Sequence, residues 1–132
     1  MMATSLPADL TAFRDSYADL FGSMPPLPAA KFEFSADIDP QALRLAEQLR
    51  AHAFDSDVFD TKATQLILFG MLLAQGAGAA KFHAIAARRS GATWEELHKV
   101  MELAAAVATL GPFNNGSALL NELRNSEEKL SS

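Results

Sequence analysis

Residues 74–97 read AQGAGAAKFHAIAARRSGATWEEL, and this stretch decides the fold. After two glycines, a run of mostly small residues carries one histidine, His83, and Gly91 has the residue type that ends a helix. Thr93 and Glu96 then have the spacing of a capping box, in which each side chain bonds the backbone amide of the other. The stretch therefore predicts a helix that ends before Gly91 and a second helix that starts at Thr93.

The segments nearer the N-terminus also show helical signals. Gly22 is placed to end a first helix with one apolar face, which carries Leu10, Phe13, Tyr17 and Leu20. We expect the proline-rich residues 23–34 to form an extended connector, because prolines remove backbone donors and restrict the residues before them. Asp39 and Pro40 have the residue types of a helix N-cap and first position, so a helix is predicted to start there.

The remaining segments complete an all-α prediction. A helix should start between residues 57 and 61, and its residues 66–74 are apolar on every side, which places it in the centre of the core or in a subunit interface. The helix that starts at Thr93 is predicted to stop at Gly111-Pro112. Asn114 and Asn115 would then stand at a helix entrance, and the chain should end in a charged, frayed tail.

Composition excludes several classes of function. The 132 residues are 49% hydrophobic, carry a net charge of −5 and contain no cysteine. We expect a single domain of residues 1–132, with N-terminal helices and connector in 1–56, the main core in 57–125 and the tail in 126–132. The acidic balance argues against a nucleic-acid partner. The start lacks a secretory pattern and the apolar run at 66–80 is too short to span a membrane, so a cytoplasmic location is expected, without a membrane partner.

Four pieces of the second half carry a family resemblance. They are Lys62 ahead of a Leu-Ile pair, His83 in KFH, the turn SGATWEEL at 90–97, and LGPFNNGSALL at 110–120. Together, residues 59–120 resemble the core of the carboxymuconolactone decarboxylase family, which includes the alkyl hydroperoxidase D-type proteins. The resemblance implies an all-α, AhpD-like helical bundle. It also implies self-assembly as a homotrimer or as a homohexamer of two trimers, with sites near subunit contacts.

The sequence departs from the family pattern at two places. Hydroperoxidase members carry C-x-x-C-x-x-x-H before this histidine, and the cysteine positions here are Gly76 and Ala79. Thiol-dependent peroxidase activity is therefore rejected, and the cysteine-free decarboxylase branch is the closer match. A family run Lys-x-Arg-Glu-Leu-Ile also differs, because Thr64 and Gln65 stand where Arg and Glu are expected.

The resemblance predicts a cofactor-free lyase acting on a small carboxylate-bearing lactone or ring, with His83 as general acid/base. An imidazole suits this task because its ordinary pKa, near 6.5, allows both protonation states at working pH. The predicted substrate-binding residues are Gln65, Thr64, Lys62, Asn114 and Arg88. Helical spacing places Arg88 well round from His83, which favours a pocket on an adjacent subunit.

Two alternatives stay open. The alanines around His83 either let helices approach closely or leave room beside the imidazole for a ligand. A non-catalytic binding or structural oligomer of the same fold is the competing function, and the neutral Thr64 and Gln65 favour it. The histidines at 52, 83 and 98 match no two-ligand helical spacing, so neither a metal site nor another cofactor is predicted.

Overall fold

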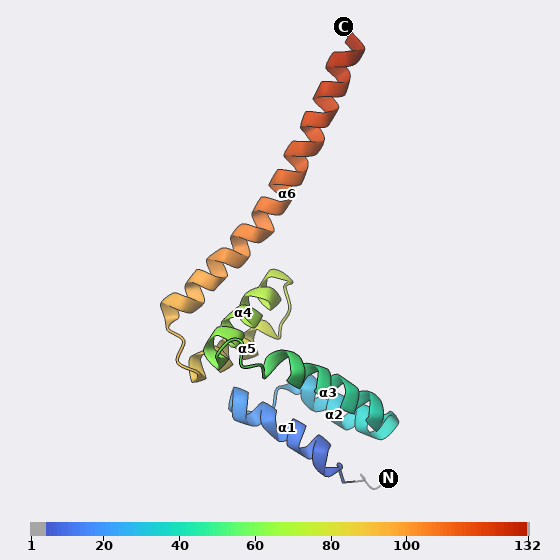
Figure 1. Cartoon of the computed structure of the whole chain (residues 1–132), viewed down its shortest axis with the longest axis vertical. Coiled ribbons are helices and arrows are strands. Elements are labelled where there is room, and N and C mark those ends of the chain that lie inside the picture. Colours follow the sequence, from blue (N-terminus) through green and yellow to red (C-terminus); the bar gives the residue numbers. More distant parts are fainter. Residues whose placement is uncertain (1–4, 132) are drawn as a thin grey trace.

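The structure is a computed structural model that describes residues 5–131, and the regular elements of this part are all helices. In chain order they are α1 (Ala8–Phe21), α2 (Pro26–Ile38), α3 (Pro40–Phe54), α4 (Thr61–Ala74), α5 (Ala80–Arg89) and α6 (Trp94–Ser131). Helix α4 packs against α5 and α6, α2 against α3, and α1 against α5. The second half of α6 extends away from the other helices (Figure 1). The all-α fold class is confirmed.

Side-chain caps start α3 and α4 where the sequence predicts helix starts. Asp39 accepts a hydrogen bond of 3.1 Å from the backbone amide of Ala42, and Pro40 is the first residue of α3. Asp60 accepts one of 2.7 Å from the amide of Ala63. Each cap satisfies an amide that has no partner within its own helix.

The boundary between α5 and α6 also follows the local sequence. Gly91 has a φ of 98°, a left-handed conformation that favours glycine, and α5 ends just before it. Thr93 N–H donates to Glu96 Oε1 over 2.9 Å, and Glu96 N–H donates to Thr93 Oγ1 over 3.0 Å. The predicted capping box is confirmed.

The expectation of an extended connector over residues 23–34 is wrong. Residues 26–38 form α2, with Pro26 at its first position. The amides of a first helical turn have no partner within the helix, so prolines remove no bond there, and the fixed φ of proline suits the helix. The prolines at 25, 26 and 28 therefore start a helix. Phe32, on this helix, is 2% exposed and packs in the core.

The predicted stop at Gly111-Pro112 is also wrong, because α6 runs from Trp94 to Ser131 with Pro112 inside it. A proline inside a helix removes one backbone hydrogen bond, at a cost of about 3 kcal/mol, and the helix continues on both sides. Asn114 and Asn115 consequently lie in the middle of α6 instead of at a helix entrance. The frayed tail predicted from residue 126 is helical as far as residue 131.

Two clusters of buried side chains meet at α5. The first joins α1, α2, α3 and α5, and contains Leu10, Tyr17, Phe21, Phe32, Leu43 and Ala86. The second joins α5 to the start of α6 and to partly buried side chains of α4, and contains Ala87, Ala92 and Leu97. Ala86 and Ala87 are both 0% exposed and belong to different clusters. Their small side chains let α5 pack closely on both sides.

Helix α4 lies between α5 and α6 and leaves one face uncovered. At Gly70, an added Cβ would come within 2.8 Å of a methyl group of Val100, so the absence of a side chain lets α4 approach α6. Ile67 and Met71 on α4 remain 45% and 56% exposed. Helix α4 contacts two neighbours, but none of its residues 66–74 is buried, so the expectation that this apolar stretch lies in the centre of the core is wrong for the single chain. Its role in a subunit interface stays a prediction.

Candidate functional site

His83 lies near the middle of α5 with its ring enclosed by side chains from other helices. The residue is 8% exposed. The ring of Phe21 from α1 meets it edge-on at 5.3 Å between centroids, and that of Phe54 from α3 meets it edge-on at 6.1 Å. An imidazole in these surroundings is partly withdrawn from water.

Gln65 on α4 fixes the orientation of the imidazole. The side-chain oxygen of Gln65 lies 2.6 Å from His83 Nδ1, and Gln65 is itself 2% exposed. An amide oxygen only accepts hydrogen bonds, so Nδ1 carries the proton and Nε2 carries the free lone pair of the neutral ring. Nε2 has no hydrogen-bond partner within residues 5–131, and it is not an enclosed atom. One edge of the ring is therefore held, and the other keeps access to solvent.

The surroundings of His83 favour its neutral form. Burial, followed by the positive charge of Arg50, lowers the pKa of His83 from 6.5 to about 4. Both effects act in the same direction, because desolvation and a nearby cation each disfavour the imidazolium. At neutral pH the free protein consequently presents a lone pair at Nε2, which is the form that accepts a proton.

A buried charged cluster lies next to the histidine. Glu47 on α3 is 0% exposed, and its Oε1 accepts a 2.7 Å hydrogen bond from the hydroxyl of Tyr17 and a further one from Lys31. The guanidinium of Arg50 lies 3.8 Å above the ring of Tyr17. Burial, and then the hydrogen bond to Glu47, raises the pKa of Tyr17, so the phenol stays protonated. We call Tyr17, Lys31, Glu47 and Arg50 the Glu47 cluster.

Two of the predicted substrate-binding residues lie on α4 near Gln65. The ammonium of Lys62 forms an ion pair of 3.1 Å with Glu96 at the start of α6. Hydrogen bonding to the Thr93 amide, and then to Lys62, lowers the pKa of Glu96. Thr64 is half-buried, one position before Gln65. Lys62 therefore connects α4 to α6, and Gln65 is the predicted residue that directly contacts His83.

The other two predicted substrate-binding residues, Arg88 and Asn114, lie apart from His83. Arg88 is exposed, donates a 2.7 Å hydrogen bond to the carbonyl of Ala92, and lies 4.2 Å above the ring of Trp94. Asn114 is exposed and lies on α6, two residues after Pro112. Within one chain, the structure brings neither residue to the imidazole.

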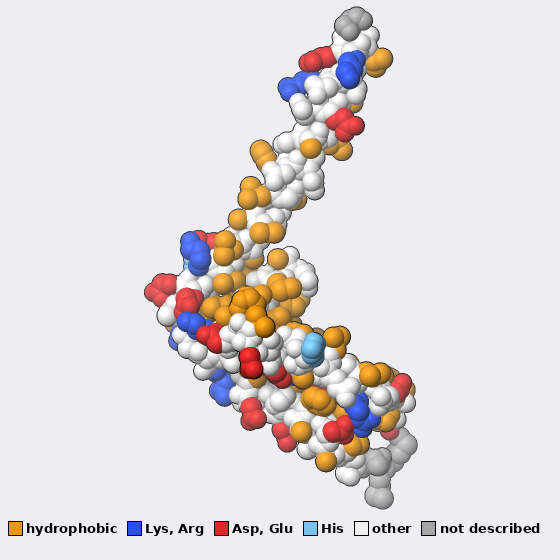
Figure 2. Space-filling model, viewed as in Figure 1, with side chains coloured by type: hydrophobic (Ala, Val, Ile, Leu, Met, Phe, Trp, Pro, Cys, Tyr) orange, Lys and Arg blue, Asp and Glu red, His pale blue; other side chains and the backbone are white. Residues whose placement is uncertain are grey.

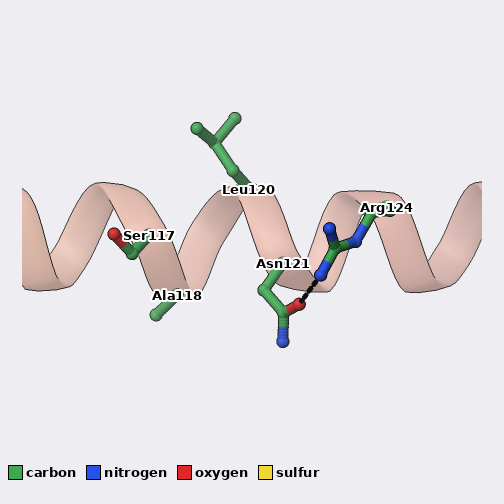
Figure 3. Close-up of a pocket in the computed structure, with 5 residues that line it drawn as sticks. All are labelled: Ser117, Ala118, Leu120, Asn121 and Arg124. Carbon is green, nitrogen blue, oxygen red and sulfur yellow. Dashed lines mark hydrogen bonds between the residues drawn. The ribbon is translucent and has the colours of Figure 1, made fainter.

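Of the small residues one turn from His83, Ala80, Ala86 and Ala87 are buried, and Ala79 is half-buried. Two hollows on the described surface lie elsewhere. One is on the side of α6 and is lined by residues of that helix alone: Ser117, Ala118, Leu120, Asn121 and Arg124 (Figure 3). The other is an apolar groove between α4 and α6, lined by Leu66, Ile67, Gly70, Met71, Ala74, Val100, Leu103, Ala104 and Val107. Neither is lined by His83.

Sequence reasoning did not identify the Glu47 cluster, although one signal for it was available. Leu43, Glu47, Arg50 and Phe54 follow each other at spacings of four, three and four residues, which is one face of a helix. Two charged residues on the face that also carries Leu43 and Phe54 predict a paired, buried group. The partners Tyr17 and Lys31 come from other helices, and no local pattern indicates them.

These elements define an all-helical protein with a buried, amide-oriented histidine and no thiol near it. The sequence model of the carboxymuconolactone decarboxylase family matches residues 40–122, which is more than half of the chain. The chain belongs to this family, and the recognition made from the sequence is confirmed. The match also includes α3, whereas the resemblance noted above covers 59–120. No curated protein and no solved structure matches the chain significantly.

The composition and the helices limit what the chain can do. Members of the family include decarboxylases, and this chain lacks the cysteines on which thiol peroxidase chemistry depends. Within the described residues, no helix is both long and apolar enough to cross a membrane. The same part of the chain holds no group of three or more histidine, aspartate or glutamate side chains arranged to bind a metal ion.

Proposed function

We propose that the protein is a cofactor-free lyase that decarboxylates a small lactone or ring compound bearing a carboxylate, with His83 as the general acid/base. The observation that carries the proposal is the arrangement of the imidazole. Gln65 holds Nδ1 at 2.6 Å, while Nε2 is left without a partner at the edge of a largely apolar enclosure. A positioned nitrogen of this kind is what proton transfer to a substrate carbon requires.

The reaction balances with one proton taken from solvent. When the bond between the ring carbon and the carboxylate breaks, carbon dioxide leaves, and the electron pair stays on carbon, delocalised into the lactone carbonyl. Nε2 of the protonated His83 then donates its proton to that carbon, and the neutral imidazole is restored. The proton has to be acquired beforehand, because the free protein holds His83 neutral.

Substrate binding supplies the reason for that proton uptake. A bound carboxylate brings a negative charge close to the imidazole and offsets the positive charge of Arg50, so it raises the pKa of His83. The enclosure also disfavours the carboxylate charge, which is lost as carbon dioxide departs. The predicted pH profile of kcat therefore falls above the pKa of His83 in the complex, and that value lies above the value of about 4 in the free protein.

The roles of the other predicted residues are part of the proposal. Gln65 acts as a positioning residue, because its amide oxygen is already bonded to His83. Thr64, half-buried beside it, is the nearer candidate for a polar contact with substrate. Lys62 and Arg88 are engaged with Glu96 and Trp94 in this chain, and Asn114 projects on α6. Arg88 and Asn114 would therefore contribute only to a neighbouring subunit's site.

Self-association is the second part of the proposal. Exposed apolar side chains run along α6 and continue the apolar groove at α4, and they include Leu103, Val107, Leu110, Phe113, Leu119, Leu120 and Leu123 (Figure 2). A helix with this much uncovered apolar surface is stabilised by burial against other helices. The family resemblance favours a trimer or a pair of trimers as the form that provides this burial.

A non-catalytic binding or structural module is the alternative function. It is favoured by the neutral Gln65, which provides no charge to stabilise an imidazolium, and by the two aromatic rings that pack on His83. In that case the histidine stabilises the contact between α4 and α5, and its replacement affects folding instead of chemistry.

The test measures carbon dioxide release from a panel of unsaturated five-membered lactone acids. We expect turnover by the wild type, a loss of about 100-fold or more in His83→Asn, and no change in His98→Asn. His98 is a matched control because it is 63% exposed in its side chain and pairs with Glu102 on the surface of α6. Circular dichroism and the melting temperature verify that each variant folds.

Two outcomes would contradict the proposal. One is the absence of carbon dioxide release from every lactone acid in the panel. The other is a His83→Asn variant that melts several degrees lower than the wild type and keeps the same turnover and pH profile. Either result favours the non-catalytic module.

A further inference from the structure

Arg50 has hydrogen-bonding capacity that the chain itself does not use. A guanidinium carries five N–H donors in a rigid, planar fork. The nearest carboxylate oxygen is Glu47 Oε2, at 3.9 Å from one terminal nitrogen of Arg50, which is too long for a hydrogen bond. Arg50 makes no hydrogen bond to any other residue in 5–131, although its side chain is only 17% exposed. Its remaining contacts are with the faces of Tyr17 and Phe54.

The charges of the Glu47 cluster do not cancel. Lys31 and Arg50 contribute two positive charges and Glu47 one negative charge, while Tyr17 stays protonated. Glu47 directs its bonded oxygen, Oε1, to Lys31 and Tyr17, so Lys31 is the principal counter-ion of this carboxylate. One positive charge remains, and it belongs to the guanidinium that has no hydrogen bond.

Aromatic rings connect this guanidinium to His83. The centre of the Arg50 guanidinium lies 5.7 Å from the ring of Phe54, and the ring of His83 lies 6.1 Å from that same ring. Tyr17, under Arg50, is 6.2 Å from Phe21, which is 5.3 Å from His83. The effect of Arg50 on the pKa of His83 agrees with this proximity. Arg50 and His83 thus both lie against the ring of Phe54.

We propose that Arg50 binds the carboxylate of the substrate, with its guanidinium fork facing both carboxylate oxygens, and presents the carbon that bears this group to His83 Nε2. The inference rests on the proposed lyase function and adds to it a specificity-determining residue on α3. Glu47 holds the guanidinium in place from the side of Oε2 and compensates only part of the positive charge. The site therefore accepts one carboxylate, and a neutral analogue of the same shape binds weakly.

The other cations near α4 and α5 are less suited to this role. Lys62 pairs with Glu96, Arg88 donates to the carbonyl of Ala92 and covers Trp94, and Arg89 donates to the carbonyl of Asp19. Each of these three already has a polar partner at its head group, whereas Lys81, which is also on α5, is exposed to solvent. Arg50 is partly buried, has no such bond and lies on the side of α5 that carries His83.

The experiment uses furan-2-carboxylate as a probe and furan-2-carboxamide as its neutral match. Binding to the full-length protein is followed by NMR titration of the His83 ring, which reports on the site without requiring turnover. We expect the carboxylate to bind at least about ten-fold more tightly than the amide, because charge-assisted hydrogen bonds are the stronger kind. We also expect it to raise the pKa of His83.

Three variants locate the source of the preference. Arg50→Gln should weaken binding of the carboxylate by about ten-fold or more and leave binding of the amide nearly unchanged. Arg50→Lys keeps the charge and loses the fork, so its affinity should be intermediate. Arg44→Gln is the matched control on the same helix, where Arg44 pairs with Asp9, and its affinity should stay within about two-fold of the wild type. Glu47 keeps Lys31 and Tyr17 as partners in Arg50→Gln, which favours folding of that variant.

The results separate this inference from the proposed function. Equal binding of the carboxylate and the amide by the wild type would overturn the role of Arg50. An Arg50→Gln variant that releases carbon dioxide with the same KM as the wild type would also overturn it. If the carboxylate binds through Arg50 while no lactone acid is decarboxylated, the anion site stands and the lyase function fails. If Arg50→Gln is unfolded, carboxylate binding by Arg50→Lys is compared with that by Arg44→Gln, and equal affinities would overturn the role of Arg50.

Discussion

The helices around His83 and the projecting helix α6 differ in what they bury. Around His83, polar side chains from separate helices are enclosed and mostly paired with one another, as in Gln65 with His83 and Tyr17 with Glu47. Along α6, large apolar side chains are exposed, with Phe113 at 71% and Val107 at 69%. The first region pairs most of its buried polar groups within one chain, although Glu47 Oε2 has no hydrogen-bond partner in the described part of the chain. The second leaves an apolar surface that one chain cannot cover.

This difference shows which properties belong to the single chain and which need a partner. A buried polar group is costly unless it is bonded, so the pairs around His83 specify one arrangement of α1, α3, α4 and α5. The hydrophobic effect is non-directional, so any apolar surface of complementary shape can cover these side chains. The candidate site is thus defined by contacts within the chain, whereas α6 presents the surface for assembly.

The largest effect is expected at α6, on assembly. We predict that the wild type is a discrete oligomer and that Val107→Glu with Leu110→Glu yields a monomer of 14.2 kDa, because two charges would have to be desolvated in the interface. Light scattering coupled to size-exclusion chromatography measures the mass. Ala12→Glu with Ala18→Glu adds the same charges at exposed positions of α1, away from α6, and should keep the oligomer. A monomeric wild type at micromolar concentration would refute the prediction.

The next effect is expected at Glu47, on stability. Removing this carboxylate in Glu47→Ala leaves Lys31 and Arg50 without their shared counter-ion, and the free energy of unfolding should fall by about 3 kcal/mol. Glu33→Ala on the exposed side of α2 is the control, and its effect should stay within about 0.5 kcal/mol. Urea unfolding monitored by circular dichroism measures both. A loss in Glu47→Ala as small as in the control would show that the cluster contributes little to the fold.

The last effect, which reaches the size of the Glu47 effect only at the acid end of the pH range, is a pH dependence of stability that comes from His83. Its pKa is about 4 in the folded protein and near 6.5 when unfolded, so the unfolded state binds the proton first as pH falls. The stabilisation is fully present above pH 6.5 and is lost between pH 6.5 and 4, by up to about 3 kcal/mol. His83→Gln cannot titrate. The difference between wild type and variant should therefore change across this window, and a constant difference would contradict the lowered pKa.

Local patterns predicted the helix boundaries that depend on neighbouring residues. The cap at Asp39 and the box of Thr93 with Glu96 involve partners three residues away, so the sequence indicates them directly. The helix start predicted between residues 57 and 61 is capped by Asp60. The same local rules gave wrong helix boundaries at prolines, because this residue type is compatible with more than one backbone structure. Prolines either begin a helix or exclude one, and the residues around Pro112 continue α6 despite the missing donor.

The candidate site was predictable only in part. His83 and Gln65 were identified as separate residues, one from its place among alanines and the other from its place in a family pattern. Their hydrogen bond spans 18 positions and depends on how α4 packs against α5. Glu47 and Arg50 were missed because their partners, Tyr17 and Lys31, lie on α1 and α2, and helical spacing within α3 indicates burial without naming the partner.

The sequence by itself determined the helical class, the family, the absence of thiol chemistry and the histidine on α5, because these depend on residue identity and short-range spacing. The tertiary structure decided that Gln65 orients this histidine, that Arg50 stands near it without a hydrogen bond, and that α6 leaves the body with its apolar side chains uncovered. The physical reason is the distance along the chain over which each interaction acts. Helix propensity and capping act within a few residues, whereas burial, pairing of charges and pKa shifts depend on which helices meet in space.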